Sequence, residues 1–191
     1  MVFNKQNKIP VLFCEINSVY KKLKCDTYDI NRNALTWAGG CPAIYHPPCR
    51  LWSRLRKLST ADVNEKYLAV WSVRMVRLFK GVLEHPAGSS LWSCCNLPKP
   101  GEIDEFGGYT IEVDQYHFGH LARKRTWLYI VGLPFNSRAL YYRKIPGKPK
   151  YALDPKTSGT KDLPERYRSY TPKLFAKYIV KIIIQINNSK S

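Results

Sequence analysis

The sequence predicts one α/β domain built on a three-layer, Rossmann-like sheet. Short apolar runs typical of buried strands occur at residues 9–13, 41–46 and 82–83, and a long helical pattern separates the last two. A strand, a helix and a second strand in this order indicate a right-handed βαβ crossover and a parallel sheet. The length of 191 residues suffices for one full core and is too short for two ordinary enzyme domains. We therefore expect residues 1–191 to form a single domain.

The apolar run at residues 41–46 is followed directly by Pro47 and Pro48. A strand interior does not tolerate two consecutive prolines. The strand is therefore expected to end at Tyr45 or His46.

The strongest helical pattern covers residues 62–80, where apolar side chains recur every three or four positions. Asp62 and Glu65 predict a capping box at its start, and Gly81 predicts its end. The strand at residues 82–83 follows at once and completes the crossover.

Glu84 follows the second strand of this crossover, as residues 47–49 follow the first. Because the carboxyl ends of parallel strands meet at one edge of a sheet, both segments are expected at the same edge. Active sites of open α/β sheets lie at this edge.

The second half of the chain shows further strand and helix signals. Residues 109–113 and 126–131 alternate like strands, and residues 134–168 are rich in Pro, Gly, Lys and Arg, which is typical of a basic, loop-rich insertion that faces nucleic acid. Thr171 and the proline after it predict the N-cap and the first position of a helix over residues 172–184.

The chain is strongly basic, with 31 Lys and Arg residues against 14 Asp and Glu residues and a formal net charge of +17. Its hydrophobic content of 45% indicates a packed globule and excludes a disordered basic tail. A positive field of this size attracts polyanions, so DNA or a nucleotide is the expected partner, ahead of an anionic membrane surface or an acidic protein. No apolar window approaches the length of a membrane span and no export signal is evident, so we expect a cytoplasmic protein without a membrane partner. The sequence leaves the oligomeric state open.

The six cysteines are scattered along the chain and show no C-x-x-C spacing. In a chain that can bury its own core and carries no export signal, we expect reduced thiols. The four histidines match no zinc-binding pattern either, so we predict no metal site.

Two residues at the expected sheet edge have the chemistry of a catalytic site. Cys49 precedes Arg50 and lies near Arg54 and Arg56, whose charges are expected to lower the pKa of its thiol and favour a nucleophilic thiolate. The alternative is a small core residue. Glu84 ends an apolar strand, where a carboxylate is rare unless it has a partner or a task. The alternative there is an acid that caps or braces the loop.

A further cluster combines aromatic and basic residues. Residues 116–118 and Trp127 carry aromatic or imidazole rings, and Arg123, Lys124 and Arg125 lie between them. Such a mixture suits a surface on which bases stack and phosphates are neutralised. A strand with an aromatic inner face and a basic outer face explains the same pattern.

Five short motifs occur in order along the chain. They are His46-Pro47-Pro48-Cys49, Leu83-Glu84-His85-Pro86-Ala87-Gly88-Ser89, Phe118-Gly119-His120, Lys124 with Thr126, and Gly132-Leu133-Pro134. In order and spacing they resemble the Pro-Pro-Cys, Glu-Asn-Pro-x-Gly, Phe-Gly-His, Lys-x-Thr and Gly-Leu-Pro motifs of the phage-type DNA cytosine methyltransferase family. The resemblance extends over residues 9–184, and residues 168–172 also look like the C-terminal end of that family.

The resemblance implies a methyltransferase-like fold and a DNA-modifying enzyme that methylates cytosine at C5. Cys49 matches the family's nucleophile, which attacks C6 of a cytosine flipped out of the duplex. Glu84 matches the acid that protonates or hydrogen-bonds the ring nitrogen N3. The residues expected to contact the base or the DNA are His46, Pro48, Arg50, His85, His120, Arg123, Lys124 and Arg125.

The resemblance also implies S-adenosylmethionine as the cofactor, with Asp26 or Asp29 binding its ribose. Either acid is equally suited to cap a helix or a turn. Residues 13–18 replace the family's glycine-rich segment, and no glycine precedes Gly39. Two other hypotheses therefore stand beside methylation. One is a cofactor-independent enzyme that cleaves a glycosidic bond with Glu84, and the other is a non-catalytic DNA-binding protein of a phage or mobile element.

Overall fold

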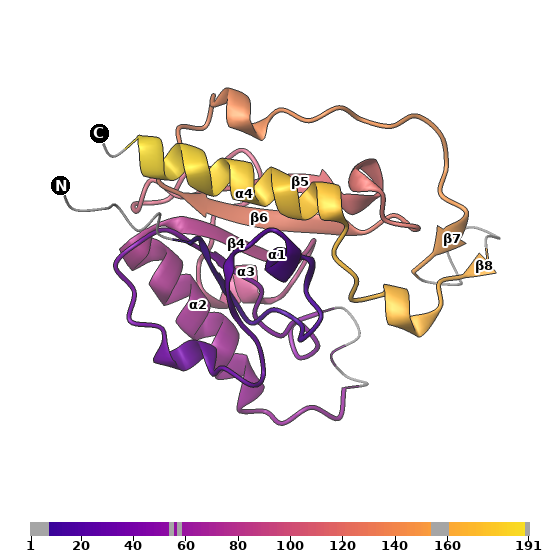
Figure 1. Cartoon of the computed structure of the whole chain (residues 1–191), viewed down its shortest axis with the longest axis horizontal. Coiled ribbons are helices and arrows are strands. Elements are labelled where there is room, and N and C mark those ends of the chain that lie inside the picture. The colour runs from indigo at the N-terminus through magenta and orange to yellow at the C-terminus, as the bar shows by residue number, and fades with distance from the viewer. Residues whose placement is uncertain (1–7, 54–55, 57–58, 154–160, 190–191) are drawn as a thin grey trace.

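A six-stranded sheet forms the centre of the molecule (Figure 1). The computed structural model describes residues 8–53, 56, 59–153 and 161–189. The sheet has the strand order β2-β1-β3-β4-β6-β5. Strands β1 to β4 are mutually parallel, and β6 runs antiparallel between β4 and β5. The strands are β1 (Pro10–Leu12), β2 (Asp26–Tyr28), β3 (Ala43–Tyr45), β4 (Gly81–Pro86), β5 (Tyr109–Asp114) and β6 (Arg125–Val131).

Helices cover both faces of this sheet. The C-terminal helix α4 (Lys173–Asn188) and the short helix α1 (Val19–Lys22) pack on one face. The long helix α2 (Glu65–Phe79) and the short helix α3 (Leu91–Cys94) pack on the other. The chain is therefore one α/β domain, as the sequence predicts. Its sheet lies between helical layers and is mixed rather than wholly parallel, because β6 is antiparallel to both of its neighbours.

The predicted crossover is present. Strand β3 pairs in parallel with β4, and α2 connects them. All three residues of β3 are buried, as are the first three of β4. Strands covered on both faces bury every side chain, which explains why they read as continuous apolar runs rather than alternating ones.

The turn between α2 and β4 depends on glycine. Gly81 has φ +126°, and a Cβ atom there would lie 2.1 Å from the carbonyl oxygen of Ala43 on the neighbouring strand. Only glycine allows the two strands to approach this closely. Gly81 ends the helical segment as predicted and also begins β4.

The predicted capping box at the start of α2 is wrong. Asn64 takes the N-cap position, and its side chain makes no capping hydrogen bond. The Asp62 carboxylate instead accepts a hydrogen bond from the backbone N–H of Asn64 over 2.9 Å. The side chain of Glu65 turns outward to bind the guanidinium of Arg50.

The last helix begins close to its predicted position but is not capped by Thr171. Pro172 itself is the N-cap, without a side-chain capping bond, and α4 continues to Asn188, four residues beyond the predicted end. Its apolar face is buried against the sheet over its whole length. No helix among the described residues is both long and apolar enough to cross a membrane.

The basic stretch at residues 134–168 contains little regular structure. Its described part includes two 3₁₀ turns, at Arg138–Leu140 and Glu165–Tyr167, and a separate two-stranded sheet of β7 (Tyr151–Ala152) and β8 (Lys161–Asp162). In Figure 1 this stretch extends from the body as an arm between β6 and α4. Residues 154–160 of the predicted insertion lie outside the described residues.

Candidate functional site

A cavity of about 950 Å³ opens at the carboxyl edge of the parallel strands. The chain leaves β1 for β2 on one side and continues to β3 on the other, so a topological switch point lies between β1 and β3. Open α/β sheets bind ligands at such a point. The lining residues come from residues 13–22 after β1, 46–50 after β3, 84–86 in β4, 124–126 at the start of β6, and 168–173 before α4.

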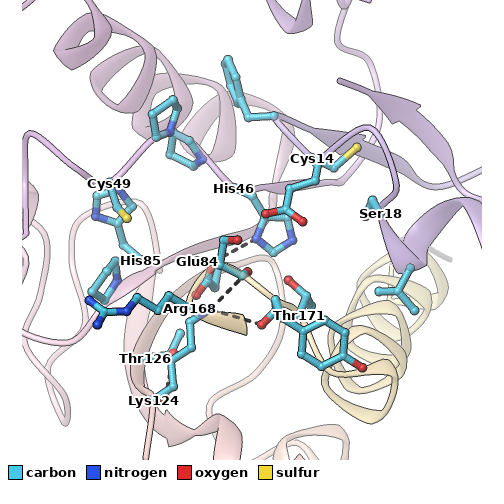
Figure 2. A pocket seen from close by; sticks show the side chains of 18 of the residues that line it. Cys14, Ser18, His46, Cys49, Glu84, His85, Lys124, Thr126, Arg168 and Thr171 are labelled. Atoms are coloured by element: carbon cyan, nitrogen blue, oxygen red, sulfur yellow. Dashed lines mark hydrogen bonds and ion pairs between the residues drawn. The ribbon is translucent and has the colours of Figure 1, made fainter. Parts of the chain in front are cut away.

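Cys49 and Glu84 both line this cavity (Figure 2). Tyr45 and Leu83 are register partners on β3 and β4, so Glu84 lies one residue beyond this pair and Cys49 follows four residues after Tyr45. The structure therefore brings the two predicted catalytic residues to one cavity from adjacent strands.

The carboxylate of Glu84 is held from two sides. Its Oε2 lies 3.0 Å from Nδ1 of His46, and its Oε1 accepts a hydrogen bond of 3.2 Å from the amide of Gln115. Burial raises the pKa of Glu84, but the hydrogen bond from His46 and the positive charge of Lys124 lower it by more. The net pKa lies below the ordinary glutamate value, so this side chain is a carboxylate near neutral pH.

The expectation that the pKa of the Cys49 thiol lies below its ordinary value is wrong. Burial and the negative charge of Glu84 raise the pKa of the thiol, and Lys124 and Arg50 only partly oppose them. The guanidinium of Arg50 is engaged by Glu65, with N–O distances of 2.9 and 2.5 Å. The side chain of Arg56 donates to the backbone carbonyl of Ser53, and residue 54 lies outside the described residues.

His46 connects Glu84 to a residue that the sequence did not single out. Its Nε2 lies 3.0 Å from the hydroxyl of Tyr20, which is on α1 and is 1% exposed. No local pattern marks Tyr20, because only the packing of α1 beside β3 brings it to the cavity. Gln115 was missed as well. A polar residue at the end of an apolar strand was the signal that singled out Glu84, and Gln115, directly after β5 at the same sheet edge, carries the same signal.

His85 is buried behind the cavity surface. Its Nδ1 lies 2.8 Å from the hydroxyl of Ser89, and no described residue forms a hydrogen bond with its Nε2. Burial lowers the pKa of His85 to about 4, although Glu84 and the backbone of Pro47 and Pro48 favour the protonated form. His85 is therefore neutral near pH 7, and through Ser89 it holds the loop that follows β4. Pro48 lines the cavity itself.

The predicted basic contacts divide into two groups. Lys124 and Arg125 line the cavity, whereas Arg123 and His120 do not. Arg123 is exposed and pairs with Asp114 at 3.0 Å. His120 is buried and lies 2.8 and 3.1 Å from the carbonyl oxygens of residues 122 and 167, so it ties the connection before β6 to the segment before α4.

Two of the cavity cations are held in place. Arg125 forms a two-pronged ion pair with Glu112, at 2.7 and 2.9 Å. The ammonium of Lys124 donates to the carbonyl oxygens of Ser169 and Tyr170 over 3.4 Å. Among the described lining residues, basic side chains outnumber acidic ones; they are Lys22, Arg50, Lys124, Arg125, Arg168 and Lys173, against Glu15 and Glu84.

The structure separates the two candidate ribose-binding acids. Asp26 begins β2 at the amino edge of the parallel strands and pairs with Arg32. Asp29 follows β2 at the carboxyl edge, which is also the edge where the cavity lies. Neither lines the cavity. Asp29 binds Lys21 over 2.6 Å, and this bond holds the pKa of Asp29 below its ordinary value.

The segment after β1 contains one residue with a backbone conformation that favours glycine. Phe13 has φ +61°, a left-handed conformation in which glycine is the favoured residue. Its ring packs edge-on against Trp71, with centroids 5.8 Å apart. Phe13 and Tyr20 line the cavity without filling it.

The aromatic and basic cluster is not a stacking surface as a whole. Residues 115–118 form a 3₁₀ turn rather than a strand, and Phe118 is buried in an aromatic cluster with Phe175 and Tyr178. Trp127 is half-buried and donates to Glu112 over 2.9 Å. Phe118 therefore belongs to the core, whereas the rings of Tyr116, His117 and Trp127 remain partly exposed.

None of the six cysteines, all of which lie in the described part of the chain, forms a disulfide. The part of the chain that the structure describes contains no group of three or more His, Cys, Asp or Glu side chains able to hold a metal ion. No family model matches the chain, and neither a curated protein nor a solved structure is significantly similar to it.

Proposed function

We propose that this protein is a DNA-modifying enzyme that transfers a methyl group to C5 of cytosine. The observation that carries the proposal is that Cys49 and Glu84 line one cavity from adjacent parallel strands. Attack on a cytosine ring needs a nucleophile at C6 and a proton donor at N3, on a planar base held between them. This cavity has both groups at its wall.

In the proposed reaction the thiolate of Cys49 adds to C6 of a flipped cytosine. A proton from Glu84 to N3 takes up the negative charge that would otherwise develop on the ring, and C5 becomes nucleophilic. After methyl transfer, a water molecule takes the C5 proton, and the electron pair left at C5 expels the thiolate from C6 and restores the aromatic ring. Since burial raises the pKa of Cys49, base binding has to be coupled to removal of its proton, and the ammonium of Lys124 stabilises the thiolate.

The proposal includes S-adenosylmethionine, which when bound would supply the methyl group. The cavity reaches the segment after β1 and is large enough for a ligand of this size, because small-molecule pockets span about 300–1,000 Å³. Residues 13–20 would face the cofactor, and Asp29 is the acid at the correct sheet edge for its ribose. The finer fold assignment, a Rossmann-like sheet of the methyltransferase type, is part of the same proposal and is supported by the switch point between β1 and β3.

DNA is the proposed partner. The net charge of +17 and the excess of basic side chains around the cavity support it. The arm over residues 134–168 adjoins the cavity at Leu153 and Arg168 and adds further basic residues beside it. The described residues form one domain, so we expect the cavity and the arm to contact the DNA and the sequence selectivity to be weak.

Methyl transfer to a cytosine-containing duplex, measured by mass spectrometry of the oligonucleotide, tests this function. With wild-type protein and S-adenosylmethionine, the oligonucleotide should gain about 14 Da per modified base, because a methyl group replaces one hydrogen atom. Cys49→Ala and Glu84→Gln should each abolish transfer. Cys94→Ala and Glu105→Gln change the same residue types outside the cavity and should leave transfer intact. Full activity in both cavity variants would disprove the proposal.

One observation favours a second function. The lowered pKa of Glu84 favours a carboxylate, and the raised pKa of Cys49 favours a protonated thiol. These ionisation states suit a reaction in which Glu84 acts without a cysteine nucleophile. In that case Glu84 activates water for cleavage of a glycosidic bond without a cofactor. Release of free base from DNA, absence of S-adenosylmethionine binding by calorimetry and full activity of Cys49→Ala would support this function over methylation.

A further inference from the structure

Three side chains from separate elements form a continuous hydrogen-bonded chain in the cavity wall. The hydroxyl of Tyr20 on α1 lies 3.0 Å from His46 Nε2, and His46 Nδ1 lies 3.0 Å from Glu84 Oε2. Tyr20 is 1% exposed, and the side chains of His46 and Glu84 are 11% and 17% exposed. Figure 2 shows the imidazole of His46 turned toward Glu84.

The chemistry of these groups fixes most of the proton positions. A carboxylate can only accept, so Nδ1 of His46 carries a proton and donates it to Glu84. Nε2 accepts from the hydroxyl of Tyr20 when the imidazole is neutral and donates to that oxygen when the imidazole is protonated. Because a hydroxyl both donates and accepts, Tyr20 holds the ring in either state. Burial keeps the pKa of Tyr20 well above its ordinary value, so Tyr20 does not release its own proton.

We propose that Tyr20 and His46 are positioning residues that orient Glu84 and resupply it with the proton it gives to the base. The inference rests on the proposed function and deepens it by naming the source of the N3 proton. The cycle starts with imidazolium and carboxylate. The Nδ1 proton passes to Glu84, and Glu84 passes a proton to N3. This leaves neutral His46 with a proton on Nε2, a carboxylate on Glu84, and a protonated base. When the aromatic ring is restored, N3 passes its proton to water and the neutral product leaves. Uptake of one proton from water by His46 then restores the starting state.

The charged and titratable groups around this chain do not offer another donor. Lys124 from the β6 end faces Glu84 and lowers its pKa, but its ammonium donates to backbone carbonyls of the segment before α4. His85 on β4 has a pKa lowered to about 4, so it is neutral near pH 7, and its Nδ1 is hydrogen-bonded to Ser89. Cys49 interacts with the Glu84 carboxylate electrostatically, and no hydrogen bond joins the two side chains among the described contacts. Gln115 after β5 contacts Glu84 but has no acidic proton. Among the described residues, His46 is the only imidazole bonded to Glu84.

The pH dependence of methyl transfer separates proton supply from simple positioning. His46→Gln retains an amide that can donate to Glu84 but cannot carry a transferable proton, whereas His46→Ala loses both functions. We expect His46→Gln to lower kcat by about 10²-fold, the lower end for a lost acid–base group, with little change in KM. We also expect the pH profile of kcat to differ between wild type and His46→Gln, because glutamine cannot carry a transferable proton. Wild-type kcat and an unchanged pH profile in His46→Gln would overturn the proposal.

Tyr20→Phe removes only the hydroxyl and tests the outer end of the chain. We expect kcat to fall by about three- to tenfold, the cost of one hydrogen bond of about 1 kcal/mol. Tyr109→Phe is the matched control, because Tyr109 is equally buried, its hydroxyl donates to a backbone carbonyl, and it lies outside the cavity. Equal kcat in Tyr20→Phe and Tyr109→Phe would contradict a role for the Tyr20 hydroxyl.

An NMR measurement on the free protein distinguishes failure of this inference from failure of the proposed function. In ¹⁵N-labelled wild type, His46 should show a slowly exchanging Nδ1–H signal, and Glu84→Gln should shift or remove it. That result supports the relay even if no methyl transfer is detected. If the His46 ring signals are the same in wild type and Glu84→Gln, the relay does not exist, whatever the enzyme does.

Discussion

Tyr45 on β3 and Leu83 on β4 are register partners in the parallel part of the sheet. This pairing determines where the chemistry of the protein lies, because Glu84 and the loop to Cys49 both start from it. The cavity at this edge joins the two residues to Lys124 and His46. The predictions below test the electrostatics, the backbone and the charge of this arrangement.

Removal of the Lys124 charge should make Cys49 less reactive. The ammonium of Lys124 lowers the pKa of the Cys49 thiol, against burial and Glu84, which raise it. In Lys124→Met the pKa should rise further, and alkylation of Cys49 by iodoacetamide near neutral pH should slow by about three- to tenfold, equivalent to half to one pH unit. Alkylation is measured by peptide mass spectrometry, with exposed Cys94 as the internal reference. A Cys49 rate equal to that of the wild type would show that Lys124 does not act on the thiol.

The stability of the protein should fall in mild acid because of His85. The pKa of His85 is lowered to about 4, mainly by burial, whereas an unfolded histidine has a pKa of about 6.5. Below about pH 6.5 the unfolded state takes up a proton that the native state refuses, so the free energy of unfolding falls as the pH falls toward 4. The slope approaches about 1.4 kcal/mol per pH unit in this window.

Urea denaturation at a series of pH values measures this effect. His85→Asn keeps a polar side chain beside Ser89 but cannot titrate, so its unfolding free energy should change less between pH 6.5 and 4. If wild type and His85→Asn show the same slope, His85 is not the source of the acid sensitivity.

Gly81 and Gly101 should differ in their tolerance of alanine. Both have a positive φ, +126° and +96°, but a Cβ at Gly81 would meet the backbone of Ala43 at 2.1 Å, whereas nothing lies within 4 Å of one at Gly101. Gly101→Ala should cost only the backbone strain, about 1 kcal/mol. Gly81→Ala should cost about 2–4 kcal/mol, since two paired strands must move apart. Thermal unfolding compares the two variants, and equal losses would mean that the close approach of β3 and β4 is not rigid.

Cations at the cavity mouth should account for part of the salt dependence of DNA binding. Lys22, Arg168 and Lys173 line the cavity and have no ion-pair partner among the described residues. Each such contact to a phosphate contributes about 0.9 to the slope of log K against log salt for duplex DNA. A triple substitution to Met should therefore reduce the slope by about two to three, as measured by fluorescence anisotropy from low to moderate salt. Lys99→Met, outside the cavity, is the control, and an equal slope in both variants would place DNA elsewhere on the surface.

Most of the sheet could be predicted from the sequence because buried parallel strands and a long amphipathic helix leave strong patterns. The runs at residues 9–13 and 41–46 and the helix before Gly81 are of this kind. Strand β2 was missed because its three residues, Asp26 to Tyr28, include two polar side chains and cannot be told from a loop. Its position beside β1 is set by the sheet and has no local signal.

For the candidate site, the sequence could predict only which residues lie near the carboxyl ends of the strands. Cys49 follows β3, and Glu84, expected just after a strand at residues 82–83, lies inside β4, which continues to Pro86. Both could be placed at one edge, but their ionisation depends on side chains that meet only in the folded chain. The guanidinium of Arg50, next to Cys49 in sequence, is paired with Glu65, and Lys124, 75 positions after Cys49, lowers the pKa of the thiol more than Arg50 does. Tyr20 contacts His46 across the switch point, a contact that no spacing predicts.

A covalent complex with a fluorinated base tests the central claim most directly. An oligonucleotide duplex with 5-fluorocytosine, incubated with the protein and S-adenosylmethionine, presents a C5 substituent that cannot leave as a proton, so addition of a thiolate at C6 becomes permanent. The account predicts a protein–DNA adduct by intact mass, linked through the peptide that contains Cys49, absent in Cys49→Ala and strongly reduced in Glu84→Gln. An adduct of equal yield in Cys49→Ala, or methylated cytosine without any adduct, would contradict it.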